Sequence, residues 1–108
     1  MRHELRFRPE ALADLEDIAR AVRRASGSGE PARRYVARVL ERCRHIATLP
    51  RAGRPRDDLE PGLRSGPFER RLVIVYRLLA LDVVEITNVF YGASDYASLY
   101  RRPREDDG

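Results

Sequence analysis

The sequence contains no lysine: all 21 basic residues are arginine, and 17 acidic residues leave a formal net charge of +4. Tryptophan is also missing, and the one cysteine, Cys43, excludes an intramolecular disulfide. No apolar run approaches the roughly 18 residues that a membrane-spanning helix requires, and no signal-peptide pattern is present. No Cys/His cluster has the spacing of metal ligands. These absences predict a cytoplasmic protein that needs no membrane, metal or cofactor.

What is present fits one small globular domain. Its 108 residues are 43% hydrophobic, which is enough for a single core without disulfide or metal staples. We place the domain at residues 1–101 and a charged tail at 102–108. The arginines have two interpretations. They reflect the codon usage of a GC-rich genome, or they serve an acidic partner, because the guanidinium group binds carboxylates and phosphates.

Two helices are predicted in the first half of the chain. The first begins at Pro9, carries apolar residues at helical spacing, and ends at the Ser-Gly-Ser-Gly sequence of residues 26–29. The second runs from about Glu30 to Thr48, and the short turn between them predicts an antiparallel hairpin. Arginines recur at four-residue intervals on the second helix, at Arg34, Arg38 and Arg42. The simpler interpretation of this ladder is a solvated face, and the other is a binding stripe.

The second half of the chain predicts a sheet. A first strand at His3–Arg8 precedes the helices, and a loop rich in Pro and Gly follows them. Three further strands then form an antiparallel meander: Leu63–Phe68, Arg70–Leu79 and Val83–Tyr91. A short helix is expected at Asp95–Tyr100. The fold class is therefore α+β.

The central strand has apolar residues on both of its faces. If Leu72, Ile74 and Tyr76 face the helices, alternation places Arg71 and Arg77 on the opposite face with Val73 and Val75. Cys43 lies on the inward stripe of the second helix and is predicted to be a core residue, because no His or acid adjoins it. For His3 and His45 we expect surface or helix-packing roles.

Several ordered motifs are similar to those of the RelE/ParE family of toxins from bacterial type II toxin–antitoxin modules. They span roughly residues 3 to 100: F-x-P-x-A-x-x-D-L-x-x-I from Phe7, L-P-x-x-G-R-P-R from Leu49, G-L-R from Gly62, V-I-V-Y-R from Val73 and V-E-I-T-N-V-F-Y-G-A-S-D from Val84. The resemblance implies an N-terminal strand and a two-helix hairpin packed on a curved antiparallel sheet, with a short C-terminal helix.

The resemblance implies one of two targets. RelE-like members cleave messenger RNA on the ribosome, whereas ParE-like members poison DNA gyrase. RNA cleavage needs groups that accept and donate protons, and arginine does this poorly because its pKa lies above about 12. Ser94 stands where RelE-like nucleases have an arginine. If this chain were such a nuclease, its catalytic residues would be Arg64, Arg77 and Tyr100.

We therefore predict a ParE-like toxin, leaning towards a non-enzymatic protein, that inhibits gyrase and is neutralised by its cognate antitoxin. Operator DNA is contacted only through the antitoxin. The alternatives are the RelE-like endoribonuclease and an inactive relative that retains antitoxin binding. The predicted partner-binding residues are Arg64, Arg70, Arg71, Arg77, Tyr91 and Asp95. Internal ion pairs with Glu69, Glu85 or Asp95 are the other interpretation of these arginines.

Overall fold

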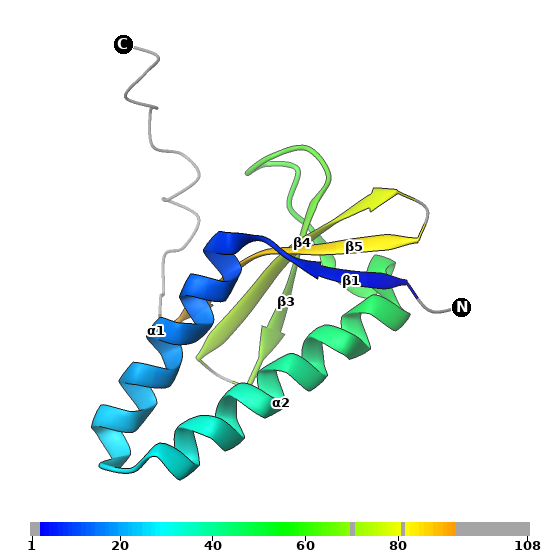
Figure 1. The fold of residues 1–108 in the computed structure, drawn as a ribbon. Helices are drawn as coiled ribbons and strands as arrows, with labels where there is room; N and C mark the ends of the chain where they lie inside the picture. Colours follow the sequence, from blue (N-terminus) through cyan, green and yellow to red (C-terminus); the bar gives the residue numbers. More distant parts are fainter. Residues whose placement is uncertain (1–2, 70, 81, 93–108) are drawn as a thin grey trace.

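The computed structural model describes residues 3–69, 71–80 and 82–92 (Figure 1). Along the chain its elements are β1 (Glu4–Phe7), α1 (Pro9–Ser26), α2 (Gly29–Thr48), the 3-10 turn η1 (Pro50–Ala52), β2 (Arg54–Pro55), β3 (Leu63–Phe68), β4 (Leu72–Ala80) and β5 (Val83–Tyr91). These bounds agree with the predicted elements to within two residues, and β2 and η1 are additions within the predicted loop. The predicted C-terminal helix lies outside the described residues.

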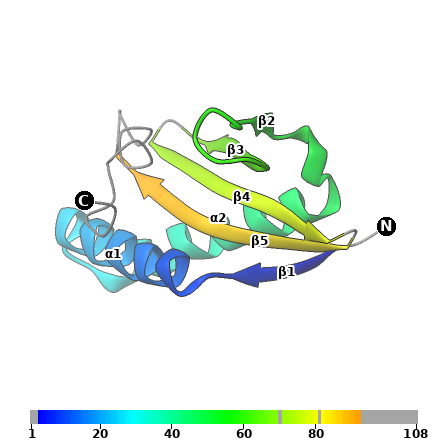
Figure 2. The same ribbon diagram turned by 90° about the horizontal axis from the view of Figure 1, so that it is seen from above.

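The strands form one five-stranded sheet in the order β1-β5-β4-β3-β2. Figures 1 and 2 show the α1–α2 hairpin covering one face of this sheet, so the predicted α+β fold is confirmed. One detail of the prediction is corrected, since the sheet is mixed rather than wholly antiparallel. β1 pairs in parallel with β5, from Glu4 opposite Val83 to Phe7 opposite Ile86.

The helix boundaries follow from local chemistry. Pro9 occupies the first turn of α1, where its missing N–H would have no partner in any case. Gly27 ends α1 in the left-handed region at φ 73°, a conformation that a residue with a Cβ rarely adopts. The Ser28 side chain then caps α2 by accepting a hydrogen bond from the Glu30 N–H.

The main core lies between the helical hairpin and the sheet. Its fully buried side chains include Val39, Cys43, Ile74, Val84 and Ile86. On the opposite face of the sheet a smaller cluster joins Leu59, Leu63 and Val75, with Val73 and Phe90 packed against it. Both faces of β4 are therefore covered, as its sequence predicts. No helix of the described segments is long and apolar enough to cross a membrane.

An aspartate fixes α1 to the sheet at a β-bulge. The register between β4 and β5 shifts between Val75 and Tyr76, so that Thr87 is the extra residue on β5. One carboxylate oxygen of Asp14 accepts hydrogen bonds from the Val89 N–H at 2.8 Å and from the Asn88 amide at 3.1 Å. Asp14, the aspartate of the first motif, thus has a structural role, because its hydrogen bonds hold α1 against β5.

Candidate partner-binding site

Arg64 lies on the helix-covered face of the sheet, at the end of β3. It pairs across the ladder with Tyr76, and residues directly opposite each other on antiparallel strands share a face. Its guanidinium donates hydrogen bonds to the carbonyl oxygens of Arg51 at 3.1 Å and Gly53 at 2.8 Å. The first role of Arg64 is therefore to hold the loop that follows α2.

Tyr76 supports the same loop from inside the core. Its side chain is 1% exposed, and its hydroxyl donates a hydrogen bond of 2.7 Å to the Pro50 carbonyl oxygen. Burial raises the pKa of Tyr76 above its usual value of 10. Gly53 passes so close to the ring that an added Cβ would lie 2.0 Å from the hydroxyl oxygen. The glycine of the L-P-x-x-G-R motif is thus explained by the close approach of the Tyr76 ring.

Arg77 lies on the opposite face of the sheet from Arg64. It pairs with Leu63, whose side chain belongs to the smaller cluster away from the helices. Its Nη2 is 2.9 Å from Glu60 Oε2, and its Nε is 4.0 Å from Glu85 Oε1. The ion pair with Glu85, which was the other interpretation of Arg77, is therefore present. The bond to Glu60 was not predicted, because sequence alone does not give the path of the loop that carries Glu60.

Tyr91, at the end of β5, forms an aromatic cluster with Tyr35 and Phe68. Arg71 lies next to this cluster, immediately before β4. The Tyr35 and Tyr91 rings meet edge to face at 5.8 Å, and the Tyr35 and Phe68 rings are 6.3 Å apart. The Gly92 N–H donates to the Arg71 carbonyl oxygen at 2.6 Å, which places Arg71 next to the end of β5. The Arg71 side chain is exposed.

Charge surrounds this aromatic cluster. The Arg38 guanidinium carbon lies 5.1 Å from the centroid of the Tyr35 ring, within cation–π range, and Arg38 also pairs with Glu69 at 3.3 Å. Burial, together with the Glu69 carboxylate, raises the pKa of Tyr35 above 10. The cluster therefore joins apolar rings to both signs of charge, a composition that suits contact with another protein.

The predicted site residues thus fall into separate places. Arg71 and Tyr91 lie together, whereas Arg64 and Arg77 lie on opposite faces and are held by the chain's own acceptors. Arg70 and Asp95, together with Ser94 and Tyr100 of the nuclease comparison, lie outside the described residues. Sequence reasoning did not select Tyr35 or Phe68, and it named Arg38 only as part of a possible binding stripe on the second helix.

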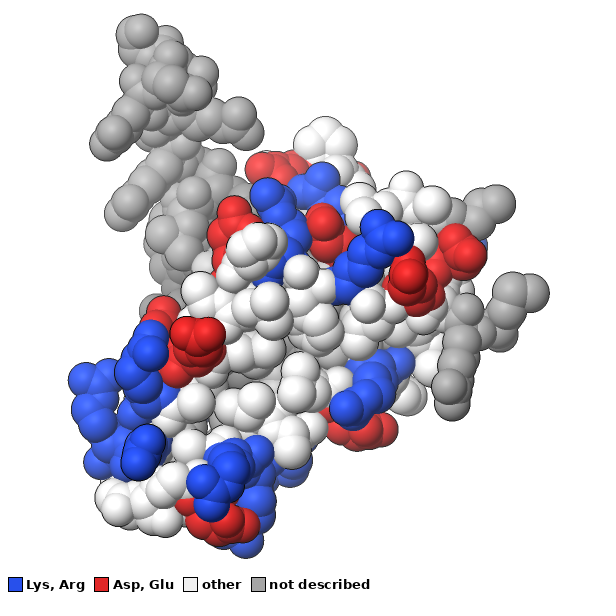
Figure 3. All heavy atoms as spheres, viewed as in Figure 1, with Lys and Arg blue, Asp and Glu red and all other residues white. Residues whose placement is uncertain are grey.

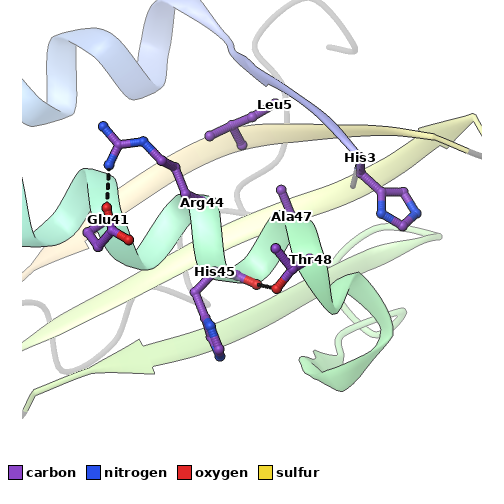
Figure 4. A pocket seen from close by; sticks show the side chains of 7 residues that line it. All are labelled: His3, Leu5, Glu41, Arg44, His45, Ala47 and Thr48. Atoms are coloured by element: carbon purple, nitrogen blue, oxygen red, sulfur yellow. Dashed lines mark hydrogen bonds and ion pairs between the residues drawn. The ribbon is translucent and has the colours of Figure 1, made fainter. Parts of the chain in front are cut away.

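The two histidines border a pocket of about 340 Å³ between β1 and α2 (Figure 4). In Figure 4 the rings of His3 and His45 point in different directions, and Glu41 is held by Arg44 at 2.6 Å. Neither Arg64 nor Arg77 lines this pocket. The surface and packing roles expected for the histidines are confirmed, since His45 is exposed and His3 is half-buried.

Cys43 lies in the core, where its thiol is not accessible. Cys43 is fully buried, and burial raises the pKa of its thiol to about 12, so it is a core residue as predicted. Within residues 3–69, 71–80 and 82–92, no group of three His, Cys, Asp or Glu side chains is arranged to hold a metal ion.

Arginines also gather at the end of the helical hairpin where α1 passes into α2 (Figure 3). Arg20, Arg23 and Arg33 border a groove of about 390 Å³ with an apolar floor. Two of these charges are offset, because Arg20 pairs with Asp17 and Arg33 pairs with Glu30. Exposed pairs of this kind stabilise a helix only weakly.

Comparison with known proteins identifies the family. The model of the ParE toxin of type II toxin–antitoxin systems (parDE) matches residues 5–96, and the chain belongs to this family. No curated protein matches in sequence.

Two solved structures share the fold. One is the chromosomal ParDE system of P. aeruginosa, with a TM-score of 0.72, 22% identity, and 84% of this chain and 97% of the other covered. The other is the RelBE2 toxin–antitoxin complex of Mycobacterium tuberculosis, with a TM-score of 0.64, 22% identity, and 84% and 99% covered.

Proposed function

We propose that this ParE-family toxin acts in the cytoplasm by binding DNA gyrase and blocking its activity, and that a cognate antitoxin neutralises it. The family assignment supports the toxin role directly. The two structural neighbours are themselves toxin–antitoxin systems, which supports an antitoxin as the partner. Operator DNA is then reached through the antitoxin alone.

The observation that carries the choice of a binding protein over a nuclease is the separation of Arg64 from Arg77. RNA cleavage requires cations and proton-transfer groups that converge on one phosphate. Here the two arginines lie on opposite sheet faces, each bonded to the protein's own oxygens. His3 and His45 line a pocket between β1 and α2 that neither of these arginines borders.

Antitoxin binding is best supported at the surface formed by Arg71 and the aromatic cluster of Tyr35, Phe68 and Tyr91. An exposed guanidinium beside partly buried rings is the arrangement found at the energetic centres of protein interfaces. Arg64 and Arg77 remain proposed contacts, but their internal bonds leave fewer donors for a partner. Arg70 and Asp95 are proposed as neighbours of this surface on sequence grounds only.

Arg71→Ala is expected to weaken antitoxin binding by roughly tenfold, equivalent to about 1.4 kcal/mol, because a charge-assisted contact is lost. The matched control is Arg24→Ala, which removes another exposed arginine from the last turn of α1. Calorimetric titration with the antitoxin encoded by the neighbouring reading frame measures the antitoxin affinity of each variant. Equal affinities for the two variants would exclude Arg71 from the interface.

Gyrase inhibition is tested with two assays side by side. The antitoxin-free toxin is expected to stop supercoiling by purified gyrase and to leave a translated message intact in primer extension. Addition of the antitoxin should restore supercoiling. Cleavage of the message in ribosomal A-site codons, with normal supercoiling, would replace this proposal with the RelE-like nuclease. Inactivity in both assays, with antitoxin binding retained, would identify an inactive relative.

A further inference from the structure

β1 is an edge strand of the sheet, on the side away from β2. Figure 2 shows it as the outermost strand, and none of the other described elements continues the sheet beyond it. The Glu4 N–H donates to the Asp82 carbonyl oxygen at 2.6 Å, and the Arg8 N–H donates to β5 at 3.0 Å. Because the bonding direction alternates along a strand, the N–H and C=O groups of Leu5 and Phe7 point away from β5. β1 therefore presents a backbone edge that can accept another strand.

The side chains of β1 differ between the two faces of the sheet. Leu5 and Phe7 pack, partly buried, against the main core beneath the helices. Glu4 and Arg6 are exposed on the opposite face and form an ion pair with each other at 2.9 Å. The edge thus carries two apolar side chains on one face and one charge of each sign on the other.

We propose that β1 pairs with β1 of a second copy of this chain, in antiparallel orientation about a two-fold axis through Leu5. In this register Leu5 lies opposite Leu5 of the second copy, and the two residues exchange both backbone hydrogen bonds. Glu4 of each copy lies opposite Arg6 of the other, so charges of alternating sign meet on the open face. The dimer goes beyond the proposed function, because it needs neither the antitoxin nor gyrase.

Charge selects this register over its neighbours. An axis through Glu4 would place two glutamates directly opposite each other, and an axis through Arg6 would do the same with two arginines. Like charges in directly opposed positions of a sheet are destabilising. The alternation of sign along β1 is therefore self-complementary when the axis passes through Leu5.

A hollow on the helix side of β1 leaves room for apolar side chains of the second copy. This pocket of about 340 Å³ between β1 and α2 is bordered by His3, Leu5 and Ala47 (Figure 4). Glu41 and Arg44 on its rim are bonded to each other at 2.6 Å, so both signs of charge are present there. Opposed side chains on paired strands have Cβ atoms about 5 Å apart, which places the second copy's Leu5 at the mouth of the pocket.

The concentration dependence of the molar mass is the first test. β1 has only 4 residues, so the interface is small and the dimer is weak. Sedimentation equilibrium of the full chain, with an untagged N-terminus and without antitoxin, is expected to give a monomer at about 5 µM and a dimer at about 500 µM. A monomer throughout this range would overturn the proposal.

Exchange of the two charges tests the register. Glu4→Arg leaves only arginines at the centre of the interface and Arg6→Glu only glutamates, so each variant alone should dimerise roughly tenfold more weakly or worse. An equimolar mixture of the two should restore association, because each arginine then lies opposite a glutamate. The matched control is Glu30→Arg, which changes the net charge equally and breaks the exposed pair with Arg33 on α2. It should dimerise like the parent chain, and failure of the mixture to associate would exclude this register.

Amide hydrogen exchange of the parent chain keeps the test valid if a variant is poorly folded. Raising the protein concentration from about 5 to about 500 µM should slow exchange at Leu5 and Phe7, whose N–H groups point outwards. Exchange at Arg6, whose N–H faces β5, should not change. A dimer without protection at Leu5 would place the contact elsewhere and overturn the proposal. Protection of Leu5 and Phe7 only after addition of the antitoxin would assign this edge to the antitoxin instead.

Discussion

Between pH 9 and pH 12 the free energy of unfolding is expected to fall by about 3 kcal/mol because of the Cys43 thiol. Burial raises the pKa of this thiol from 9.0 to about 12. Each unit of pKa difference between the folded and unfolded states corresponds to about 1.4 kcal/mol. The folded pKa is the higher one, so the stabilisation is complete below pH 9 and is lost as the pH rises towards 12.

The absence of lysine makes this effect measurable. No lysine titrates in this range, and Tyr35 and Tyr76, whose pKa values are raised by burial, contribute with the same sign only above pH 10. Urea unfolding at a series of pH values, under reducing conditions, measures how the free energy of unfolding changes with pH. Cys43→Ala should remove most of the decrease between pH 9 and 10, whereas Tyr76→Phe should leave it. An unchanged pH profile in Cys43→Ala would show that the thiolate is tolerated in the fold.

Periodicity was sufficient to predict the two helices and the four longer strands, and the resemblance to a family supplied their arrangement. Apolar spacing placed Cys43 and Val39 inside α2, and alternation along β4 assigned Ile74 and Arg77 to opposite faces correctly. These patterns report burial, which is determined by positions close together in the chain. They carry no information about the partner that a polar side chain meets across the molecule.

The arrangement of the arginines could not be predicted for that reason. Arg64 donates hydrogen bonds to the carbonyl oxygens of Arg51 and Gly53, whereas Arg77 bonds to Glu60. Both acceptor groups belong to the loop from Pro50 to Gly62, which supplies partners on the two opposite faces of the sheet. The Pro and Gly residues identified this segment as a loop, but not its path. For the same reason, Arg34, Arg38 and Arg42 were predicted to lie on one polar helix face with a single role. Of these three, only Arg38 and Arg42 line pockets beside β3.

Gly53→Ala is expected to destabilise the protein by about 3 kcal/mol, at the upper end of overpacking effects. The new methyl group would lie 2.0 Å from the Tyr76 hydroxyl oxygen and 2.8 Å from Cζ. The ring cannot move aside easily, because it is 1% exposed and bonded to Pro50. Relief of the clash would displace the loop and break the bonds from Arg64 to Arg51 and Gly53.

Gly66→Ala is the matched control, because a Cβ there would meet only Ile46 Cδ1 at 3.8 Å, an ordinary contact. It should be neutral or stabilising by up to about 1 kcal/mol, since alanine restricts the unfolded chain. Urea unfolding measures the free energy of unfolding of both variants and of the double variant Gly53→Ala/Tyr76→Phe. The comparison separates the clash with the Tyr76 hydroxyl from the general effect of replacing glycine by alanine. Removal of the hydroxyl should reduce the penalty at residue 53 by about 1 kcal/mol or more, because the two side chains are in contact and their effects are not additive. If Gly53→Ala were as stable as Gly66→Ala, the loop would not be held against Tyr76, and the internal role assigned to Arg64 would lose its basis.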